Sequence, residues 1–180
     1  RSTAPNVQQI SGKTEAERID AALKELDGSG IPVSVDTMHP GVLSVCLQHD
    51  VHMINDIGGL ASEAYAKTAA ASHLPVIAMA AFSRPGDAVG HAATEKALAA
   101  VVARCEKYGI ENYILDPGVG MWTPMRSVDD DWDLLQHYDS FLSLDRPLLA
   151  AISRKTFLGM LLDREPEDRL SGSLAATFWL

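Results

Sequence analysis

The sequence NYILDPGVG, residues 112–120, joins a short apolar run to an acidic residue and a Pro-Gly loop. Four further runs of similar length occur along the chain: PVSVD (32–36), VHMIN (51–55), PVIAM (75–79) and PLLAAI (147–152). Short, mostly apolar runs are typical of strands that are covered on both faces of a parallel sheet. We therefore predict that each run forms a strand.

Longer segments with apolar residues at helical spacing lie between these runs. They predict helices over residues 14–26, 40–49, 62–72, 91–108 and 128–142. Thr14 and Glu17 have the spacing of a capping box, and Gly109 suits the position after the fourth helix. The acidic run at residues 129–131 is expected to be a solvated helix start that the helix dipole stabilises. The alternation of strands and helices predicts an α/β fold.

Polar residues at the ends of the predicted strands distinguish between two α/β architectures. Asp36, Asn55, Asp116 and Ser153 end a strand or follow it directly, and Met79 holds the equivalent place on the third strand. Side chains from many strands meet at this end of a (β/α)8 barrel, whereas a doubly wound sheet binds ligands at one switch point. We predict a (β/α)8 TIM barrel, with residues 1–180 in a single domain.

The ends of the chain indicate that part of this barrel is missing. The sequence starts at Arg1 without an initiator Met and stops inside the apolar run 178–180. We expect an incomplete excerpt that lacks the first and last β/α elements.

The amino-acid composition argues against nucleic acid and membranes as binding partners. The 180 residues are 47% hydrophobic and carry 15 Lys and Arg against 24 Asp and Glu, a net charge of −9, which opposes binding to nucleic acid. No run is long enough to span a membrane, and no signal sequence opens the chain, so a cytoplasmic protein is expected. Cys46 and Cys105 lack the spacing of a metal or redox pair and are predicted to be buried, reduced thiols.

Each polar motif has a structural interpretation as well as a functional one. Asp36 or Thr37 could cap the next helix, the Asp116 loop could be a tight turn, and the cluster at residues 153–156 could be a solvated helix start. Asn55 and Asp56 could form a turn with the two glycines that follow them. Because alternate strand residues face opposite ways, only one of these two can point into the barrel mouth.

Together the motifs place two carboxylates, an amide and a Lys at one end of the sheet. This set suits a flat heterocycle with donor and acceptor edges, such as a 2-amino-4-oxo ring. A carboxylate can accept hydrogen bonds from the ring N–H groups, while a Lys donates to the oxo group.

The order of the motifs resembles that of the dihydropteroate synthase family. The matching segments are VSVDT (33–37), INDIGG (54–59), LDPGVG (115–120), SRKTFLG (153–159) and RLSGSLAA (169–176). The resemblance implies a (β/α)8 barrel that joins 6-hydroxymethyl-7,8-dihydropterin diphosphate to p-aminobenzoate in folate biosynthesis. It also implies release of diphosphate with the help of Mg²⁺, although no metal ligand is assigned in this chain.

The resemblance also assigns roles to individual residues. It implies catalytic roles for Asp36, Asp116 and Lys155, because diphosphate departure leaves a delocalised cation that the two carboxylates would stabilise. Asp36, Asn55, Asp116 and Lys155 would hold the pterin. The further substrate-binding residues implied are Thr3 in the diphosphate loop, Met79, Arg154, and Thr156 facing the aminobenzoate carboxylate. Barrels of this kind often pair, so a homodimer is expected.

Three of the positions that depart from the family pattern bear on turnover. Ala4 stands where the family has an Arg, Ala80 where it has a His, and Met121 where it has an aromatic residue. Whether these changes abolish turnover is open from the sequence, as is the identity of the aryl amine. Two alternatives follow: a non-catalytic pterin-binding paralogue, and a pterin-dependent methyltransferase domain.

Overall fold

Four parallel strands form the sheet in the part of the chain that the structure describes. The structure is a computed structural model that describes residues 10–120 and 123–180. The strands are β1 (Ser34–Asp36), β2 (Met53–Asp56), β3 (Val76–Met79) and β4 (Tyr113–Asp116). They lie side by side in sequence order, and each pairs in parallel with the next. The first four predicted strands are confirmed.

The predicted fifth strand, residues 147–152, is wrong as a strand. This segment makes one isolated bridge to β4, between Leu148 and Leu115. Leu115 donates its N–H to the carbonyl of Pro147 and accepts from the N–H of Leu149. Beyond that point the hydrogen bonds are local: Ala151 donates its N–H to the carbonyl of Leu149, and Ile152 to that of Ala150. The apolar run therefore packs against the sheet edge without extending the ladder.

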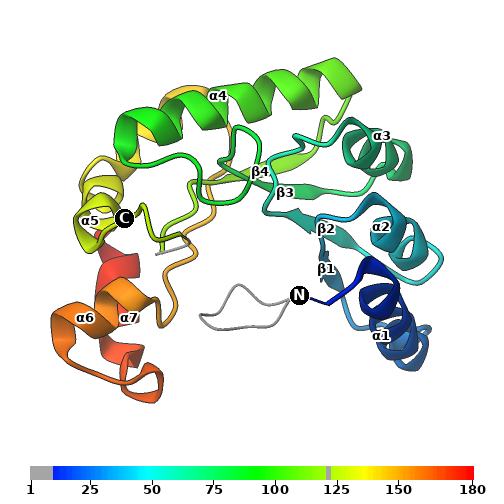
Figure 1. The fold of residues 1–180 in the computed structure, drawn as a ribbon, viewed down its shortest axis with the longest axis horizontal. Helices are drawn as coiled ribbons and strands as arrows, with labels where there is room; N and C mark the ends of the chain where they lie inside the picture. The colour runs from blue at the N-terminus through cyan, green and yellow to red at the C-terminus, as the bar shows by residue number, and fades with distance from the viewer. Residues whose placement is uncertain (1–9, 121–122) are drawn as a thin grey trace.

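Helices alternate with the strands and continue beyond them. They are α1 (Gly12–Leu26), α2 (Pro40–Cys46), α3 (Glu63–Ser72), α4 (His91–Tyr108), α5 (Val128–Gln136), α6 (Thr156–Leu162) and α7 (Leu170–Trp179). Two 3-10 helices, η1 (Tyr138–Leu144) and η2 (Pro166–Asp168), complete the set. Figure 1 shows α1 to α4 along the outer face of the sheet and α5 to α7 grouped beyond β4. Sequential parallel strands with helices on one face are the arrangement of a (β/α)8 barrel, as predicted.

Local hydrogen bonds set the ends of two helices differently from the prediction. Ser11, not Thr14, is the N-cap of α1, because the Ser11 hydroxyl accepts the N–H of Thr14 at 3.1 Å. The predicted helix over 128–142 divides at His137 into α5 and the 3-10 helix η1. In contrast, α4 spans the predicted residues and ends at Gly109, whose φ of +72° is the left-handed conformation expected there.

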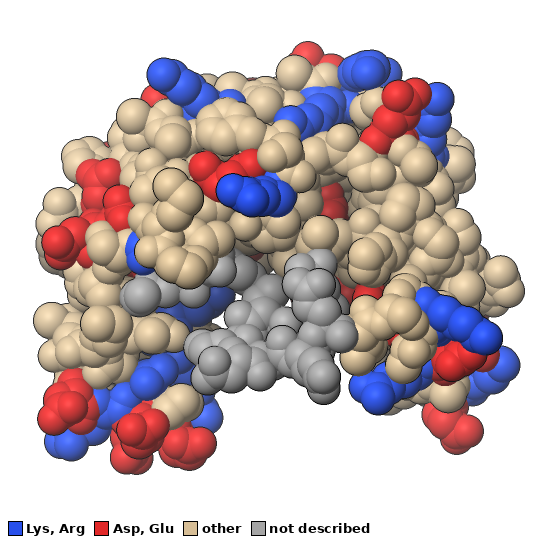
Figure 2. All heavy atoms as spheres, viewed as in Figure 1, with Lys and Arg blue, Asp and Glu red and all other residues tan. Residues whose placement is uncertain are grey.

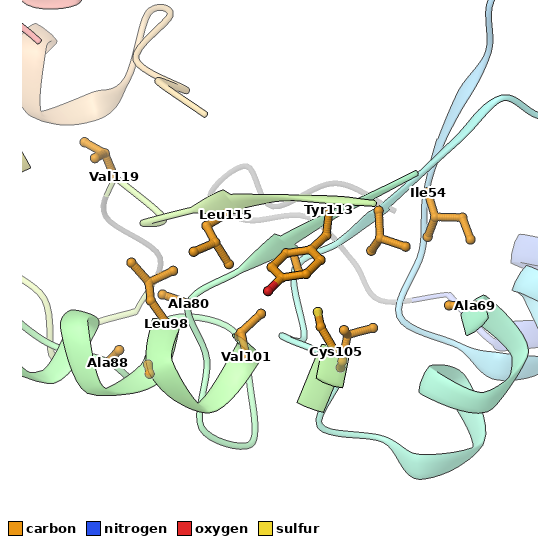
Figure 3. Packing of buried hydrophobic residues seen from close by; sticks show 14 of the residues in the cluster. Ile54, Ala69, Ala80, Ala88, Leu98, Val101, Cys105, Tyr113, Leu115 and Val119 are labelled. Atoms are coloured by element: carbon orange, nitrogen blue, oxygen red, sulfur yellow. The ribbon is translucent and has the colours of Figure 1, made fainter. Parts of the chain in front are cut away.

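The core lies between the sheet and the outer helices. Leu98, Val101 and Cys105 of α4 face Tyr113 and Leu115 of β4 in Figure 3, and all five are buried. Both cysteines of the chain are free and buried, as predicted. Burial raises the pKa of the Cys46 thiol to about 11 and that of Cys105 to about 12, so both stay protonated at neutral pH.

On the outer surface, Lys and Arg side chains alternate with Asp and Glu side chains around the face shown in Figure 2. Within residues 10–120 and 123–180, no helix has the length and the apolar character that crossing a bilayer requires.

Candidate functional site

The strand register places four of the predicted site residues on one face of the sheet. Asp36 pairs with Asn55, which in turn pairs with Ile77. Met79 pairs with Asp116. Paired residues of parallel strands point to the same side, and so do residues two apart along a strand. Asp36, Asn55, Met79 and Asp116 therefore share the face opposite the outer helices.

Asp56 lies on the other face, so Asn55 is the residue of this pair that points into the barrel. Asp56 pairs with Ala78 and is 2% exposed. Its carboxylate accepts the backbone N–H groups of Gly58, at 2.9 Å, and Leu60. Burial raises the pKa of Asp56 to about 6. Asp56 thus forms the turn after β2.

Thr37 makes two hydrogen bonds at the end of β1. The buried Thr37 hydroxyl donates to Glu15 of α1 at 2.7 Å and accepts the N–H of His39 at 3.2 Å. Thr37 thus forms a turn ahead of α2, whose N-cap is His39 and has no side-chain cap hydrogen bond. Asp36 is exposed on the shared face, where a ligand in the barrel could reach its carboxylate.

Asp116 is a buried carboxylate at the start of a tight loop. One oxygen, Oδ1, accepts the N–H of Gly118 at 2.8 Å. Burial raises the pKa of Asp116, while the Gly118 N–H and the nearby Lys155 and Arg126 oppose that rise. Gly118 has a φ of +72°, and a Cβ there would lie 3.1 Å from the Cγ atom of Met79. The loop therefore packs directly on the predicted Met79.

Lys155 comes from the segment before α6 and crosses the same loop. A Cβ on Gly120 would lie 3.1 Å from Cδ and 3.4 Å from Nζ of Lys155, so the missing side chain makes room for the Lys. Burial lowers the pKa of Lys155, and the carboxylates of Asp116 and Asp131 oppose that change. The ammonium group is thus flanked by two acids.

Arg154 and Thr156 lie on either side of Lys155 in different environments. Arg154 is exposed and has a φ of +55°, a left-handed conformation that is uncommon for a residue with a side chain. Two residues at the start of α7 bind the backbone of Arg154. The Ser173 hydroxyl accepts the Arg154 N–H at 2.8 Å, and Arg169 donates to the Arg154 carbonyl at 3.2 Å. Thr156 is half-buried and begins α6.

Arg126 and Asp131 belong to this site although the sequence reasoning missed both. They form an ion pair of 2.8 Å with side chains only 2% and 0% exposed. The prediction that residues 129–131 are a solvated helix start is therefore wrong for Asp131. Asp131 is three and four residues before the buried Leu134 and Leu135, a spacing that places all three on the inner face of α5. This helical spacing was the signal in the sequence that could have shown Asp131 to be buried.

Arg104 of α4 was also missed. Its guanidinium donates to the carbonyls of Gly59 at 2.6 Å, Ala81 at 2.9 Å and Phe82 at 2.6 Å. These acceptors follow β2 and β3, so Arg104 ties together two loops at the site end of the sheet. Its position in the middle of a helical pattern gave no indication of this role.

Some predicted residues lie outside the described part of the chain, namely Thr3, Ala4 and Met121. Ala80, the third departure from the family pattern, is buried and donates its N–H to the carbonyl of Asp116 at 2.8 Å.

Within the described residues, no group of three or more His, Cys, Asp or Glu side chains could hold a metal ion.

Comparisons with known proteins agree on one family. A family model described as "Pterin binding enzyme" matches residues 1–180. The dihydropteroate synthase of Escherichia coli (strain K12) is 32% identical over 184 residues, an alignment that covers 97% of this chain and 64% of that relative. The chain therefore spans somewhat less than two thirds of that relative's length.

Two solved structures show the same fold. The dihydropteroate synthase of Xanthomonas albilineans, determined with 4-aminobenzoic acid, superposes with a TM-score of 0.83 at 30% identity, over 99% of this chain and 66% of that one. The dihydropteroate synthase of Coxiella burnetii in complex with pteroic acid superposes with a TM-score of 0.81, also at 30% identity, over 99% of this chain and 67% of that one.

Proposed function

Because this chain belongs to the pterin-binding enzyme family, we propose that it provides the pterin site of a dihydropteroate synthase. The reaction joins 6-hydroxymethyl-7,8-dihydropterin diphosphate to p-aminobenzoate in folate biosynthesis. The observation that carries the proposal is the shared face of Asp36, Asn55, Met79 and Asp116. The relatives determined with 4-aminobenzoic acid and with pteroic acid support this choice of substrates.

The buried Asp116 is assigned to the N–H edge of the pterin. Its Oδ1 is oriented by the Gly118 N–H, which aims the carboxylate from a fixed loop. Asn55 adds an amide with a donor and an acceptor, and Lys155 donates to the oxo group of the ring. Met79, packed on the loop, supplies an apolar surface for the flat ring.

The chemical step breaks the bond between the pterin methylene carbon and a diphosphate oxygen. A bond then forms from that carbon to the amine nitrogen, which loses a proton. The positive charge that develops on the pterin lies between Asp36 and Asp116, so both carboxylates stabilise it. Arg154 and Thr156 are assigned to the anionic groups, namely the diphosphate and the aminobenzoate carboxylate, and Thr3 to the diphosphate.

Several further properties belong to the same proposal. Mg²⁺ would assist diphosphate release, but the described residues do not by themselves form a cation site, so the steps above use only this chain's side chains. We also propose one domain over residues 1–180, a cytoplasmic location and no binding to nucleic acid or membrane. A homodimer is supported by apolar side chains exposed on α6 and α7, among them Leu161 at 61% and Leu174 at 63%.

A second candidate function is a pterin-binding paralogue without turnover. The observation that favours it is Ala80, which is buried in the core cluster and brings no imidazole where the family has a His. A pterin-dependent methyltransferase remains a third alternative, with methyl transfer from a methylated reduced pterin as its signature.

The test measures diphosphate release from the dihydropterin diphosphate by the complete natural protein, with Mg²⁺ and with or without p-aminobenzoate. A synthase releases diphosphate only with the amine, and Lys155→Ala abolishes the release. Lys96→Ala, on the exposed face of α4, is the matched control and should leave the rate unchanged. Tight pterin binding without release would establish the paralogue, and release that ignores the amine would refute the synthase.

A further inference from the structure

The buried ion pair of Arg126 and Asp131 holds the loop from Asp116 to Gly120 by hydrogen bonds to the loop backbone. Arg126 donates through Nη1 to the carbonyl of Gly118 at 2.8 Å and through Nη2 to Oδ1 of Asp131 at 2.8 Å. The same Asp131 oxygen accepts the N–H of Gly120 at 2.8 Å. The pair therefore supplies one donor and one acceptor to the loop backbone.

This chain of hydrogen bonds continues into the proposed pterin site. The N–H of Gly118 orients Asp116, while its carbonyl is held by Arg126. Gly120, held by Asp131, is the residue over which Lys155 passes. A shift of the loop would thus move the Asp116 carboxylate and the surface under Lys155 together.

Stability alone gives a weak explanation for the pair. Two well-packed apolar side chains of similar size often stabilise a fold as well as a buried ion pair does, because both charges must be desolvated. Within the described residues, Nε of Arg126 and Oδ2 of Asp131 have no hydrogen-bond partner, which adds to that cost. Apolar side chains, however, could not bond to the carbonyl of Gly118 and the N–H of Gly120.

We propose that Arg126 and Asp131 are positioning residues that fix the Asp116–Gly120 loop so that Asp116 and Lys155 meet the same pterin ring. This inference rests on the proposed pterin site. It predicts that pterin affinity depends on the bonds from the pair to the loop, separately from the stability of the fold.

Three variants of the complete protein separate the two effects. Asp131→Asn removes the carboxylate that forms the ion pair with the buried Arg126 and should lower the melting temperature. The double variant Arg126→Met with Asp131→Asn removes both charges and keeps an acceptor for the Gly120 N–H, so the melting temperature should recover. Arg126→Lys keeps the ion pair, but its single ammonium group cannot reproduce the fork that reaches both Gly118 and Asp131.

Two readouts are measured for each variant. The first is the dissociation constant of 6-hydroxymethyl-7,8-dihydropterin diphosphate without p-aminobenzoate, from calorimetry. The second is hydrogen exchange of the backbone amides of residues 118–120 in the protein without ligand. The double variant and Arg126→Lys should bind the pterin about tenfold or more weakly and exchange faster in this loop. The control replaces the exposed pair Glu63 and Lys67 of α3 by Gln and Met, and should change neither readout.

Each outcome decides the proposal. Parent-like affinity and parent-like exchange in a double variant whose melting temperature has recovered overturn it. If the double variant does not fold, Arg126→Lys decides by the same two readouts. If the unaltered protein binds no pterin, the proposed function fails, while the exchange measurement still tests whether the pair orders the loop.

Discussion

Replacing Gly59 by alanine should destabilise this protein far more than the same change at another glycine of similar conformation. Gly59 follows β2 and has a φ of +60°. A Cβ there would lie 2.7 Å from the carbonyl oxygen of Met79 and 3.0 Å from that of Ala81. Both are backbone atoms at the end of β3, so relief of the contact requires movement of the sheet edge.

The size of the effect follows from two contributions. An alanine in the left-handed region costs about 1–2 kcal/mol, and forcing extra volume into a packed site typically costs another ~1–3 kcal/mol. Gly59→Ala should therefore lower the free energy of unfolding by about 2–5 kcal/mol. Gly109→Ala is the matched control, because Gly109 has a φ of +72° and no atom within 4 Å of the added Cβ. It should cost only the conformational part, about 1–2 kcal/mol.

Guanidinium denaturation of the two variants and the parent measures the difference. Thermal melts should agree, at roughly 2–4 °C per kcal/mol for a protein of this size. Pterin affinity should also fall in Gly59→Ala and not in Gly109→Ala, because Met79 packs on the loop that carries Asp116. Equal losses of stability in the two variants would refute the steric reasoning.

Three further predictions concern other parts of the chain. The pKa of His49 is raised by its hydrogen bonds to Asp27 and Asp20, so this stabilisation is complete below the unfolded pKa of about 6.5 and is lost as pH rises through the folded pKa. Thermal melts across this range should show a smaller fall in Asp27→Asn than in the parent, and parallel curves would contradict this. Ser173→Ala leaves the Arg154 N–H without its acceptor and should lower the unfolding free energy by about 1–3 kcal/mol, measured by denaturation; an unchanged midpoint would show that this bond does not hold the loop. Lys155→Met removes a charge that lowers the pKa of Asp116, so NMR titration of the Asp116 carboxyl should show a higher pKa, and an unchanged value would place Lys155 too far away to act on it.

Much of the fold could be predicted because local patterns decide it. Short, mostly apolar runs locate β1 to β4, and the period of two along a strand allows only one of Asn55 and Asp56 to face the barrel. The end of α4 at Gly109 follows from the backbone freedom of glycine. Composition and spacing within single segments were sufficient for these features.

Other features depend on contacts between segments and could not be predicted in the same way. The run 147–152 has the apolar pattern of a strand, but whether it joins a ladder depends on the edge of β4. The spacing of Asp131 from Leu134 and Leu135 indicates the inner face of α5, but its ion pair with Arg126 depends on the path of the loop before the helix. The capping pattern indicated Thr14, whereas the hydroxyl that caps α1 is that of Ser11, three residues earlier.

The three carbonyls bound by Arg104 limit how this scaffold can be re-engineered. An outer helix of a barrel is usually treated as an interchangeable module, to be shortened, grafted or redesigned as long as its apolar stripe is kept. Here one guanidinium of α4 serves the loops after two different strands. A transplanted helix that preserves every core contact but omits this arginine would leave those loops without a shared anchor, so the mouth of the barrel has to be designed together with its outer layer.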